Sequence, residues 1–307
     1  TRTPPPIKLL QGCSGSLLHA RFFGHVRVMC RAQPATAVAA YEGVKDAMAE
    51  CAERMKFLPW DCSHTEDIMH DPLLLRYGYK ESAVVHALSA AGAAWGVATA
   101  CSQGWLPECE CGRVHHSQST SALWEWGGCA HGIQYGITIS RKMLTRTTGA
   151  AGTPNALRRL EKHNLKAGRL AVKKTLTSIC KCHGVSGSCQ QKTCWKAPAS
   201  MSNIVRHIVE KYHKARRLGD EGSKQRNNDL LFLEPSPDHC ALHGNAPRVC
   251  GWRNETHAQG DCGRLCCGRG FNITHEVKSY KCDCKFVWCC QLSCNDCLQH
   301  RWVSTCT

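Results

Sequence analysis

Apolar residues recur at helical spacing in the first part of the chain. Pro34 and Pro59 enclose this pattern, and prolines are frequent near helix boundaries. We therefore predict a helix between them that turns Cys51 toward a core. Its buried face consists of residues that follow one another at intervals of three or four: Tyr41, Val44, Met48, Cys51 and Met55.

Two further helices are predicted downstream. The first runs from about Glu81 to Cys101 and is largely apolar, but His86 and two glycines interrupt it. These interruptions favour a buried helix over a membrane span, and no transmembrane segment is predicted. The second runs from about Pro154 to Thr177, with Thr153 as a candidate cap before a proline at the first helical position.

The last 68 residues lack a helical period and contain 12 cysteines, so their core must come largely from cross-links and short hairpins. The other 12 cysteines lie before residue 195, and the two even counts allow each half to pair internally. We therefore predict an α+β, disulfide-rich fold. It has a helical N-terminal domain over residues 1–237 and a small cysteine-rich C-terminal domain of short β-hairpins over residues 238–307. The stretch from Trp195 to His239, with a polar run over 219–229, is interpreted as the linker.

The cysteine content also indicates the compartment. One residue in about thirteen is Cys, which is typical of secreted, disulfide-bonded proteins. The chain begins at Thr1 without an initiator Met, so we expect a signal peptide to have been removed or omitted. Asn254 and Asn272 begin two candidate glycosylation sequons. Zinc is the rival interpretation of the Cys294 and Cys297 spacing, but it would leave most other cysteines unexplained, and no metal is predicted.

The positive charge is concentrated in the middle of the chain. The formal net charge is +15, and residues 130–239 alone carry 20 Lys/Arg against 7 Asp/Glu. Such asymmetry favours a polyanionic partner, which for a secreted protein is a heparan sulfate proteoglycan rather than a nucleic acid. A solvated helix face is the alternative. The candidate residues form one stripe on the third predicted helix: Arg158, Lys162, Lys166, Arg169 and Lys173. We expect a further helical stretch to carry Lys211, Lys214, Arg216 and Arg217.

Four closely spaced cysteines are compatible with a doubly bridged hairpin. Facing residues of an antiparallel hairpin have nearly constant index sums. Cys180 with Cys194 gives 374, and Cys182 with Cys189 gives 371. Two nested disulfides are therefore possible, and they would hold a glycine-rich loop between them.

Ser186 lies near the tip of that loop. Gly184 and Gly187 flank it, so neither shields its hydroxyl. A catalytic serine is one interpretation, but a nucleophile elbow needs Gly where the chain has Ser188, and His183 is equally explained as a loop residue. A tight turn without function is another. The third is a hydroxyl presented for modification; we predict no catalytic residue and no enzyme.

The hairpin sequence resembles the signature of the Wnt family of secreted, lipid-modified signalling proteins. Residues 180–189 read Cys-Lys-Cys-His-Gly-Val-Ser-Gly-Ser-Cys. Other similar landmarks extend along nearly the whole chain: Trp60-Asp61-Cys62-Ser63, Glu81-Ser82-Ala83, Trp126-Gly127-Gly128-Cys129, Thr193-Cys194-Trp195, Cys266-Cys267-Gly268-Arg269-Gly270 and the run from Cys282 to Cys290. The family's usual complement is also 24 cysteines.

The resemblance implies a two-domain ligand shaped like a hand. Its thumb is the nested-disulfide hairpin, where Ser186, beside Gly184 and Val185, would carry an O-linked palmitoleate added by a membrane-bound O-acyltransferase. A secretion carrier would export the protein to the extracellular space and matrix, where the lipid associates it with membranes. No other cofactor is implied. Its finger would be the turn Lys285-Phe286-Val287-Trp288. Thumb and finger would bind the cysteine-rich domain of Frizzled receptors, and another surface would recruit an LDL-receptor-related co-receptor, with activation of Wnt signalling in development and cell fate.

The predicted finger also has a physical rationale. A turn that exposes Phe286, Val287 and Trp288 together is typical of a binding surface, because aromatic anchors are common hot spots. The alternative is that Trp288 packs inward on Cys289 or Val303. Two other classes of function also stay open: a heparin-binding matrix protein, which would not need the serine hairpin, and a secreted hydrolase, which would label with a serine-directed probe.

The chain departs from the family pattern at a few positions. Asp61 stands where many relatives have Asn, which removes a possible early sequon. Phe271 follows the Cys-Cys-Gly-Arg-Gly landmark where Tyr is frequent, which is a conservative packing change.

Overall fold

The computed structural model describes ten segments, residues 5–19, 25–62, 73–109, 132–144, 155–190, 192–219, 226–240, 248–251, 260–288 and 291–307. The chain forms two compact units. Unit 1 contains Thr1–Arg54 and Cys62–Ser236, and unit 2 contains Met55–Asp61 and Pro237–Thr307. The segment Met55–Asp61 therefore belongs with the C-terminal residues rather than with the helical domain in which we place it by sequence. The predicted cap Thr153 lies outside the described residues.

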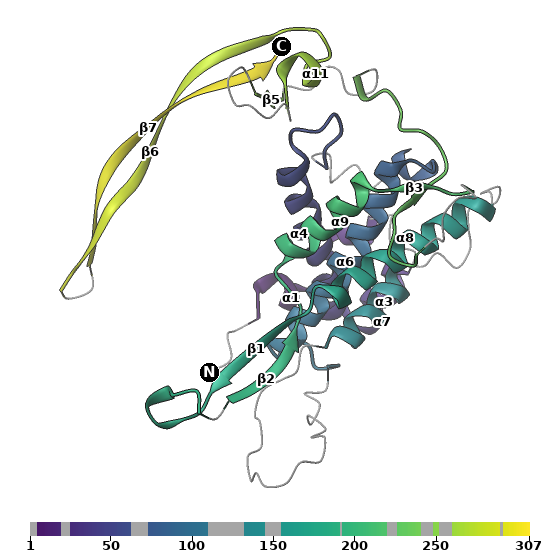
Figure 1. The fold of residues 1–307 in the computed structure, drawn as a ribbon. Helices are drawn as coiled ribbons and strands as arrows, with labels where there is room; N and C mark the ends of the chain where they lie inside the picture. Colours follow the sequence, from purple (N-terminus) through teal and green to yellow (C-terminus); the bar gives the residue numbers. More distant parts are fainter. Residues whose placement is uncertain are drawn as a thin grey trace. The chain divides into compact units, whose positions relative to one another are not determined.

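Unit 1 is built around one apolar helix (Figure 1). This helix, α6 (Lys80–Ser102), packs against α7 (Ile133–Leu144), α8 (Asn155–Lys174) and α9 (Met201–His213). The long helix α4 (Pro34–Met55) starts at the expected proline. The shorter elements of the unit are α1 (Ile7–Gln11), α2 (Gly15–His19), α3 (Val26–Ala32), η1 (Leu73–Arg76), η2 (Val185–Gly187), β1 (Thr177–Cys182), β2 (Lys192–Ala197), β3 (Arg216–Arg217) and β4 (Leu231–Phe232).

Small residues let other helices approach α6 closely. A side chain at Gly96 of α6 would collide with the Ala39 carbonyl of α4, and one at Gly168 of α8 would collide with the Ala87 carbonyl of α6. Among the described helices, α6 alone is long and apolar enough to cross a membrane, but 89% of its apolar window is buried in the folded protein. This burial is what a core helix requires, as the pattern over Glu81 to Cys101 predicts.

Buried polar side chains connect the helices to the rest of unit 1. The fully buried Asn164 of α8 donates to the Leu231 carbonyl of β4 and accepts from the Leu231 amide, both at 3.0 Å. The Tyr212 hydroxyl of α9 donates to Glu81 Oε1 of α6 at 2.9 Å. Burial raises the pKa of Tyr212 above its ordinary value, and the Glu81 charge raises it further.

The stretch interpreted as a linker contains a packed helix, so that prediction is wrong for its first part. The amphipathic helix α9 buries one face in unit 1, with Met201, Ile204, Val205 and Ile208 as the buried residues. It ends at His213, so Lys214 lies beyond it. Arg216 and Arg217 are not helical either, because they form β3, which pairs in parallel with β4.

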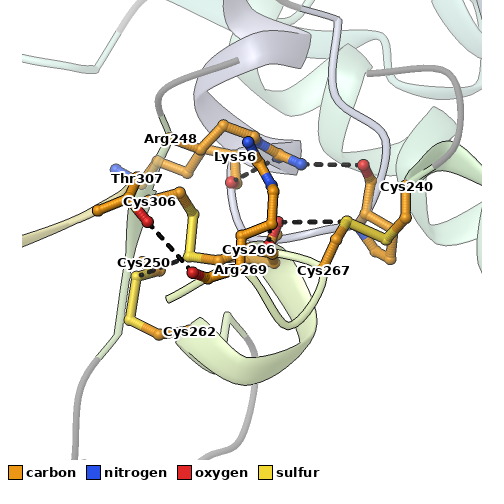
Figure 2. The surroundings of a disulfide bond; sticks show 12 residues. Lys56, Cys240, Arg248, Cys250, Cys262, Cys266, Cys267, Arg269, Cys306 and Thr307 are labelled. Atoms are coloured by element: carbon orange, nitrogen blue, oxygen red, sulfur yellow. Dashed lines mark hydrogen bonds between the residues drawn. A yellow bond between two sulfur atoms is a disulfide. The ribbon is translucent and has the colours of Figure 1, made fainter. Parts of the chain in front are cut away.

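Unit 2 has a core made largely of cystine. Figure 2 shows its four cysteines, Cys250, Cys262, Cys266 and Cys306. They cluster with Leu265, and Phe271 packs against them. The strands are β5 (Val249–Cys250), β6 (Phe271–Val287) and β7 (Gln291–Cys306), in the order β5-β7-β6, with the short helix α11 (Cys262–Leu265) alongside the cysteines. The strand pair β6–β7 is one long antiparallel hairpin rather than several short ones.

Arg248 joins the two stretches of chain that make up unit 2. Its guanidinium donates to the carbonyls of Lys56, Leu58 and Pro59, and forms an ion pair with Asp61 at 2.8 Å. One side chain thereby satisfies three backbone acceptors and a carboxylate. The departure at Asp61 noted in the sequence therefore supplies the counterion of a partly buried arginine.

The described residues contain ten disulfides, and each joins cysteines of the same half of the chain. Five lie before residue 195: Cys13–Cys30, Cys51–Cys62, Cys101–Cys109, Cys180–Cys194 and Cys182–Cys189. Five lie after residue 239: Cys240–Cys267, Cys250–Cys262, Cys266–Cys306, Cys282–Cys297 and Cys284–Cys294. The CxxC cysteines Cys294 and Cys297 are thus each bonded to β6.

Candidate functional site: two exposed hairpin tips

The first tip belongs to the β1–β2 hairpin of unit 1. The strands pair antiparallel from Thr177 opposite Ala197 to Cys182 opposite Lys192. Cys180 faces Cys194 directly and is bonded to it, and a second disulfide joins Cys182 to Cys189 beyond the last strand pair. Two covalent cross-links therefore restrain the loop that follows β1.

Ser186 is displayed at this tip. It adopts a left-handed conformation with φ of 58°, and the neighbouring Gly187 has φ of 76°. The turn is closed by backbone bonds, with the Gly184 amide donating to the Ser188 carbonyl at 2.8 Å. A side chain at position 184 would collide with Ser188, so this turn requires glycine there. The Ser186 side chain is exposed and makes no hydrogen bond to another described residue.

The surroundings of Ser186 do not resemble a hydrolytic site. The His183 ring, the nearest imidazole in sequence, contacts the Thr193 hydroxyl across the hairpin through Nε2 at 3.0 Å. Val185 beside the serine is 90% exposed, so an apolar side chain and a hydroxyl point to solvent together. Such a tip can receive a covalent group or enter a partner's groove. Within the described part of the chain, no histidine or carboxylate is hydrogen-bonded to the Ser186 hydroxyl.

The hairpin carries positive charge without compensation from its own residues. Lys181, Lys192 and Lys196 are exposed, and residues 177–197 contain no Asp or Glu. Lys181 and Lys192 lie in the last strand pairs before the tip loop, and Lys196 lies near the base of the hairpin. This positive charge favours approach to an anionic surface.

The second tip is the end of the β6–β7 hairpin of unit 2. Trp288 is 92% exposed in the turn, so it does not pack inward, and Val303, its alternative neighbour, is buried at the other end of β7. Cys289 lies outside the described residues. Phe286 is 68% exposed, and Leu292 opposite it on β7 is 67% exposed. The turn therefore presents a contiguous apolar surface, which in a secreted protein is typical of an interaction site.

Leu292 was not among the residues predicted for this tip. The sequence could have identified Leu292, because in a hairpin centred on residue 289 the residue opposite Phe286 is Leu292. Two disulfides, Cys282–Cys297 and Cys284–Cys294, cross the strands below the tip. Between them the register shifts, and Asp283 has a positive φ of 47°. This bulge alters which residues of β6 face those of β7 toward the tip.

The basic stripe on α8 is only partly a surface. Lys162, Lys166 and Lys173 are exposed and Arg158 is half-buried, but the prediction of Arg169 as a surface cation is wrong, because only 8% of this residue is exposed. Arg169 lies at the border between the exposed and buried faces of α8, where the spacing pattern alone cannot distinguish them. Burial and the nearby Arg141 charge lower its pKa to about 10.

One of the two glycosylation candidates falls within the described residues. Asn272 lies exposed near the start of β6, opposite Thr305. Asn254 lies outside the described residues. The side chain at Asn272 can thus receive a bulky group without displacing packed atoms.

Known proteins resemble this chain along most of its length. The model of the Wnt family matches residues 19–307. The chain is 57% identical to Abnormal cell lineage protein 44 of Caenorhabditis elegans over 303 residues, covering 99% of this chain and 85% of that protein. It is 56% identical to the protein of the same name from Caenorhabditis briggsae, again over 99% of this chain and 86% of the relative.

A solved structure is also similar. A chain in the structure of human WLS in complex with WNT8A superposes with a TM-score of 0.66 at 29% identity, covering 89% of this chain and 95% of that one. The helical unit and the cystine-rich, stranded unit thus both have counterparts of known fold. The chain belongs to the Wnt family of developmental signalling ligands.

Proposed function

We propose that this Wnt ligand is secreted and activates its receptor through both hairpin tips. In this proposal Ser186 carries an O-linked monounsaturated fatty acyl group, palmitoleate, and the acylated tip with Gly184 and Val185 binds the cysteine-rich domain of a Frizzled receptor. The observation that carries the proposal is the exposed Ser186 hydroxyl, which two disulfides hold on a narrow hairpin.

An acyl chain on Ser186 would dominate the binding energy. Each buried methylene contributes about 0.8 kcal/mol, so about sixteen carbons offer on the order of 10 kcal/mol before ordering costs. The hairpin is already ordered by its cross-links, so little of this energy is needed to order the backbone at the tip.

The second contact in this proposal is the turn Lys285-Phe286-Val287-Trp288, with Leu292 beside it. A highly exposed tryptophan adjoining a phenylalanine and a leucine is the composition expected of a binding hot spot. The turn carries no lipid, so its contribution depends on the side chains alone.

Further partners act before and beside the receptor. A membrane-bound O-acyltransferase would load Ser186, and a WLS-type carrier would export the product; the solved complex of WNT8A with human WLS supports the second step. The lysines of the hairpin fit the anionic surface of a membrane, with which the lipid would associate the protein in the extracellular space and matrix. An LDL-receptor-related co-receptor completes the proposed signalling complex.

Acylation is tested by mass spectrometry. The chain is secreted from animal cells, the peptide that contains Cys180 to Cys194 is isolated, and its mass is compared with that of the Ser186→Ala variant. We expect a fatty-acyl increment confined to Ser186 in the wild-type protein. Ser188→Ala is the matched control and should keep the increment. An unmodified Ser186 on folded, signalling-competent protein would refute the lipid-bearing part of the proposal.

The role of the second tip is tested by binding to an immobilised Frizzled cysteine-rich domain. Trp288→Ala should weaken binding by on the order of 30-fold, because loss of a hot-spot side chain costs about 2 kcal/mol. Trp302→Ala is the matched control, since Trp302 is 73% exposed on the same hairpin but far from its tip. Equal effects of the two changes would contradict a specific role of the turn.

Binding to heparan sulfate is the third proposed contact. With Arg169 buried, the exposed lysines Lys162, Lys166 and Lys173 carry the proposal, and the half-buried Arg158 adjoins them. Changing the three lysines to glutamine should lower the salt concentration needed for elution from heparin. The control removes equal charge at Lys56, Lys278 and Lys281, exposed lysines of unit 2, and should change the elution less. Elution that is unchanged by the first set would exclude α8 as the contact.

A further inference from the structure

The β6–β7 hairpin, whose strands run side by side in Figure 1, carries two neighbouring histidines away from its tip. His275 of β6 is paired with Trp302, and His300 of β7 is paired with Val277, so the histidines are diagonal neighbours across the strands. Their ring centroids lie 5.2 Å apart, and the Trp302 ring lies 4.8 Å from that of His275. The register places all four side chains on one face of the hairpin.

Both imidazoles are available to a ligand. The two side chains are exposed, and neither forms a hydrogen bond or ion pair with another described residue. A neutral imidazole keeps one ring nitrogen with a lone pair, and this nitrogen is the commonest metal ligand in proteins. An anion would need both rings to be protonated at this short distance, where they would repel each other. A metal ion is therefore the ligand that suits the pair.

The separation of the two rings fits a shared ion. Metal–nitrogen bonds of about 2.0–2.1 Å place the centroids of two imidazoles that share a tetrahedral ion about 5 Å apart. The observed separation is 5.2 Å, so neither strand needs to move. The ring planes lie at 18° to each other, and rotation about the Cβ–Cγ bonds of the two exposed side chains can turn a nitrogen of each ring toward one ion.

The surroundings on this face do not repel a cation. The positions next to the histidines on the same face are uncharged: Ile273, Val277, Ser279 and Leu298. The first charged residues toward the tip on this face are Lys281 and Asp296, which pair with each other at 2.7 Å. The ion therefore meets no uncompensated ammonium group on this part of the hairpin.

The two histidines lie where the hairpin has no covalent cross-link. Cys266–Cys306 holds the end of β7 at the base, and Cys282–Cys297 joins the strands nearer the tip. Between these disulfides, the described residues of β6 and β7 are joined by strand pairing and side-chain contacts alone. An ion bound by His275 and His300 would supply a reversible cross-link in this interval.

The available donors decide which metal fits. Every described cysteine is in a disulfide and offers no thiolate. Imidazole nitrogens suit Cu²⁺, Zn²⁺ and Ni²⁺, and Cu²⁺ binds most tightly of the three at a given nitrogen site. We propose that His275 and His300 bind one Cu²⁺ ion that cross-links β6 to β7, with water completing its coordination. The two histidines are 25 residues apart in the sequence, so no local spacing motif indicates them.

Isothermal titration of the secreted, full-length protein with CuCl₂ at pH 7.5 tests the site. His275→Gln and His300→Gln should each lower the affinity of one Cu²⁺ ion by at least about tenfold, because loss of even an outer-shell partner costs about 10- to 100-fold. His213→Gln changes an exposed histidine of unit 1; as the matched control, it should leave this ion unaffected. Zn²⁺ should bind the wild-type protein more weakly. Equal Cu²⁺ binding by the wild-type protein and both hairpin variants would refute the site.

Limited proteolysis tests the cross-link itself. With Cu²⁺ at ten times its dissociation constant, tryptic cleavage after Lys278 of β6 should slow by about tenfold, because the ion binds the closed hairpin only. Cleavage after the exposed Lys214 of unit 1 reports any direct inhibition of trypsin and should keep its rate. The protection should disappear in His275→Gln. If Cu²⁺ slows cleavage after Lys278 no more than cleavage after Lys214, the proposed cross-link is wrong.

Discussion

The two units reach a stable core by different chemistry. In unit 1 the core consists of apolar side chains on α6 and the helices around it, and small residues let their backbones approach closely. In unit 2 four of the five residues in the core cluster are cysteines, and both faces of the long β6–β7 hairpin are largely exposed. Removal of apolar surface from water stabilises the first unit, whereas covalent cross-links carry most of that role in the second.

The difference also separates the two exposed tips. The β1–β2 hairpin extends from a packed helical unit, while the β6–β7 tip depends on strands that bury little surface. Five disulfides for about seventy residues offset this deficit in unit 2. Damage to one unit should therefore leave the other largely intact.

The largest expected effect follows removal of the Cys266–Cys306 disulfide, which spans 40 residues. Changing both cysteines to alanine should destabilise unit 2 by about 2–5 kcal/mol. Limited proteolysis with mass mapping should then show early cleavage within 260–307 and protection of α6 and α8. The matched control replaces Cys13 and Cys30 of unit 1 by alanine. In this variant the helices of unit 1 should remain protected from cleavage. Simultaneous cleavage of both units would contradict their independence.

The next effect tests the polar connections of unit 1. Asn164→Ala removes two hydrogen bonds and leaves the amide and carbonyl of the buried Leu231 without partners. The free energy of unfolding of unit 1 should fall by about 2–4 kcal/mol, since each unpaired group costs about 1–3 kcal/mol. Urea unfolding followed by the helical circular dichroism signal measures it. Asn203→Ala on the exposed face of α9 should change the value little.

A smaller effect depends on pH. The folded-state pKa of Tyr212 lies above its unfolded value of about 10, so its contribution is fully present below pH 10 and is lost as the pH rises further. Unit 1 should therefore lose up to about 1.4 kcal/mol per pH unit above pH 10 through this group. Urea unfolding at pH 9 and 11 should show the loss in the wild-type protein and a smaller one in Tyr212→Phe. Tyr280→Phe in unit 2 is the control; identical pH slopes in all three proteins would contradict the assignment.

The smallest effect distinguishes exposed from partly buried charge in unit 2. Arg301 donates to Glu276 Oε2 across the hairpin at 2.7 and 2.9 Å, but both side chains are exposed. Glu276→Gln should therefore cost less than about 1 kcal/mol in thermal unfolding, and high salt should reduce that cost. Asp61→Asn should cost more, because Arg248 is largely covered. A larger loss of stability in Glu276→Gln than in Asp61→Asn would show that burial does not decide how much these ion pairs contribute.

Local patterns in the sequence predicted much of the fold. Intervals of three and four residues, with prolines on either side, located the helix through Cys51, and α4 extends from Pro34 to Met55. The apolar run that the sequence placed from Glu81 to Cys101 is helix α6, one residue longer at each end. These signals are local, so a single element is enough to produce them.

Features that depend on distant partners were not predictable in the same way. The sequence did not predict the length of the β6–β7 hairpin. Most residues on both faces of its strands are exposed, so no alternation of apolar and polar residues identifies them. Arg169 has the spacing of a surface residue but is buried when α8 packs in unit 1. Gly43 of α4, Trp95 of α6 and Trp105 line one cavity of unit 1, and no single stretch of sequence contains it.

The composition of unit 2 from two separate stretches of sequence has a consequence for protein engineering. Met55–Asp61 and Pro237–Thr307 belong to one compact body, and Arg248 binds the backbone of the first stretch. A chimaera that exchanges only the C-terminal segment would leave the donor's Arg248 facing a foreign loop. During synthesis on the ribosome, Met55–Asp61 cannot join unit 2 until Pro237–Thr307 has been made, which begins some 180 residues later. A domain exchange that uses a single junction near residue 237 would therefore not transfer the whole of unit 2.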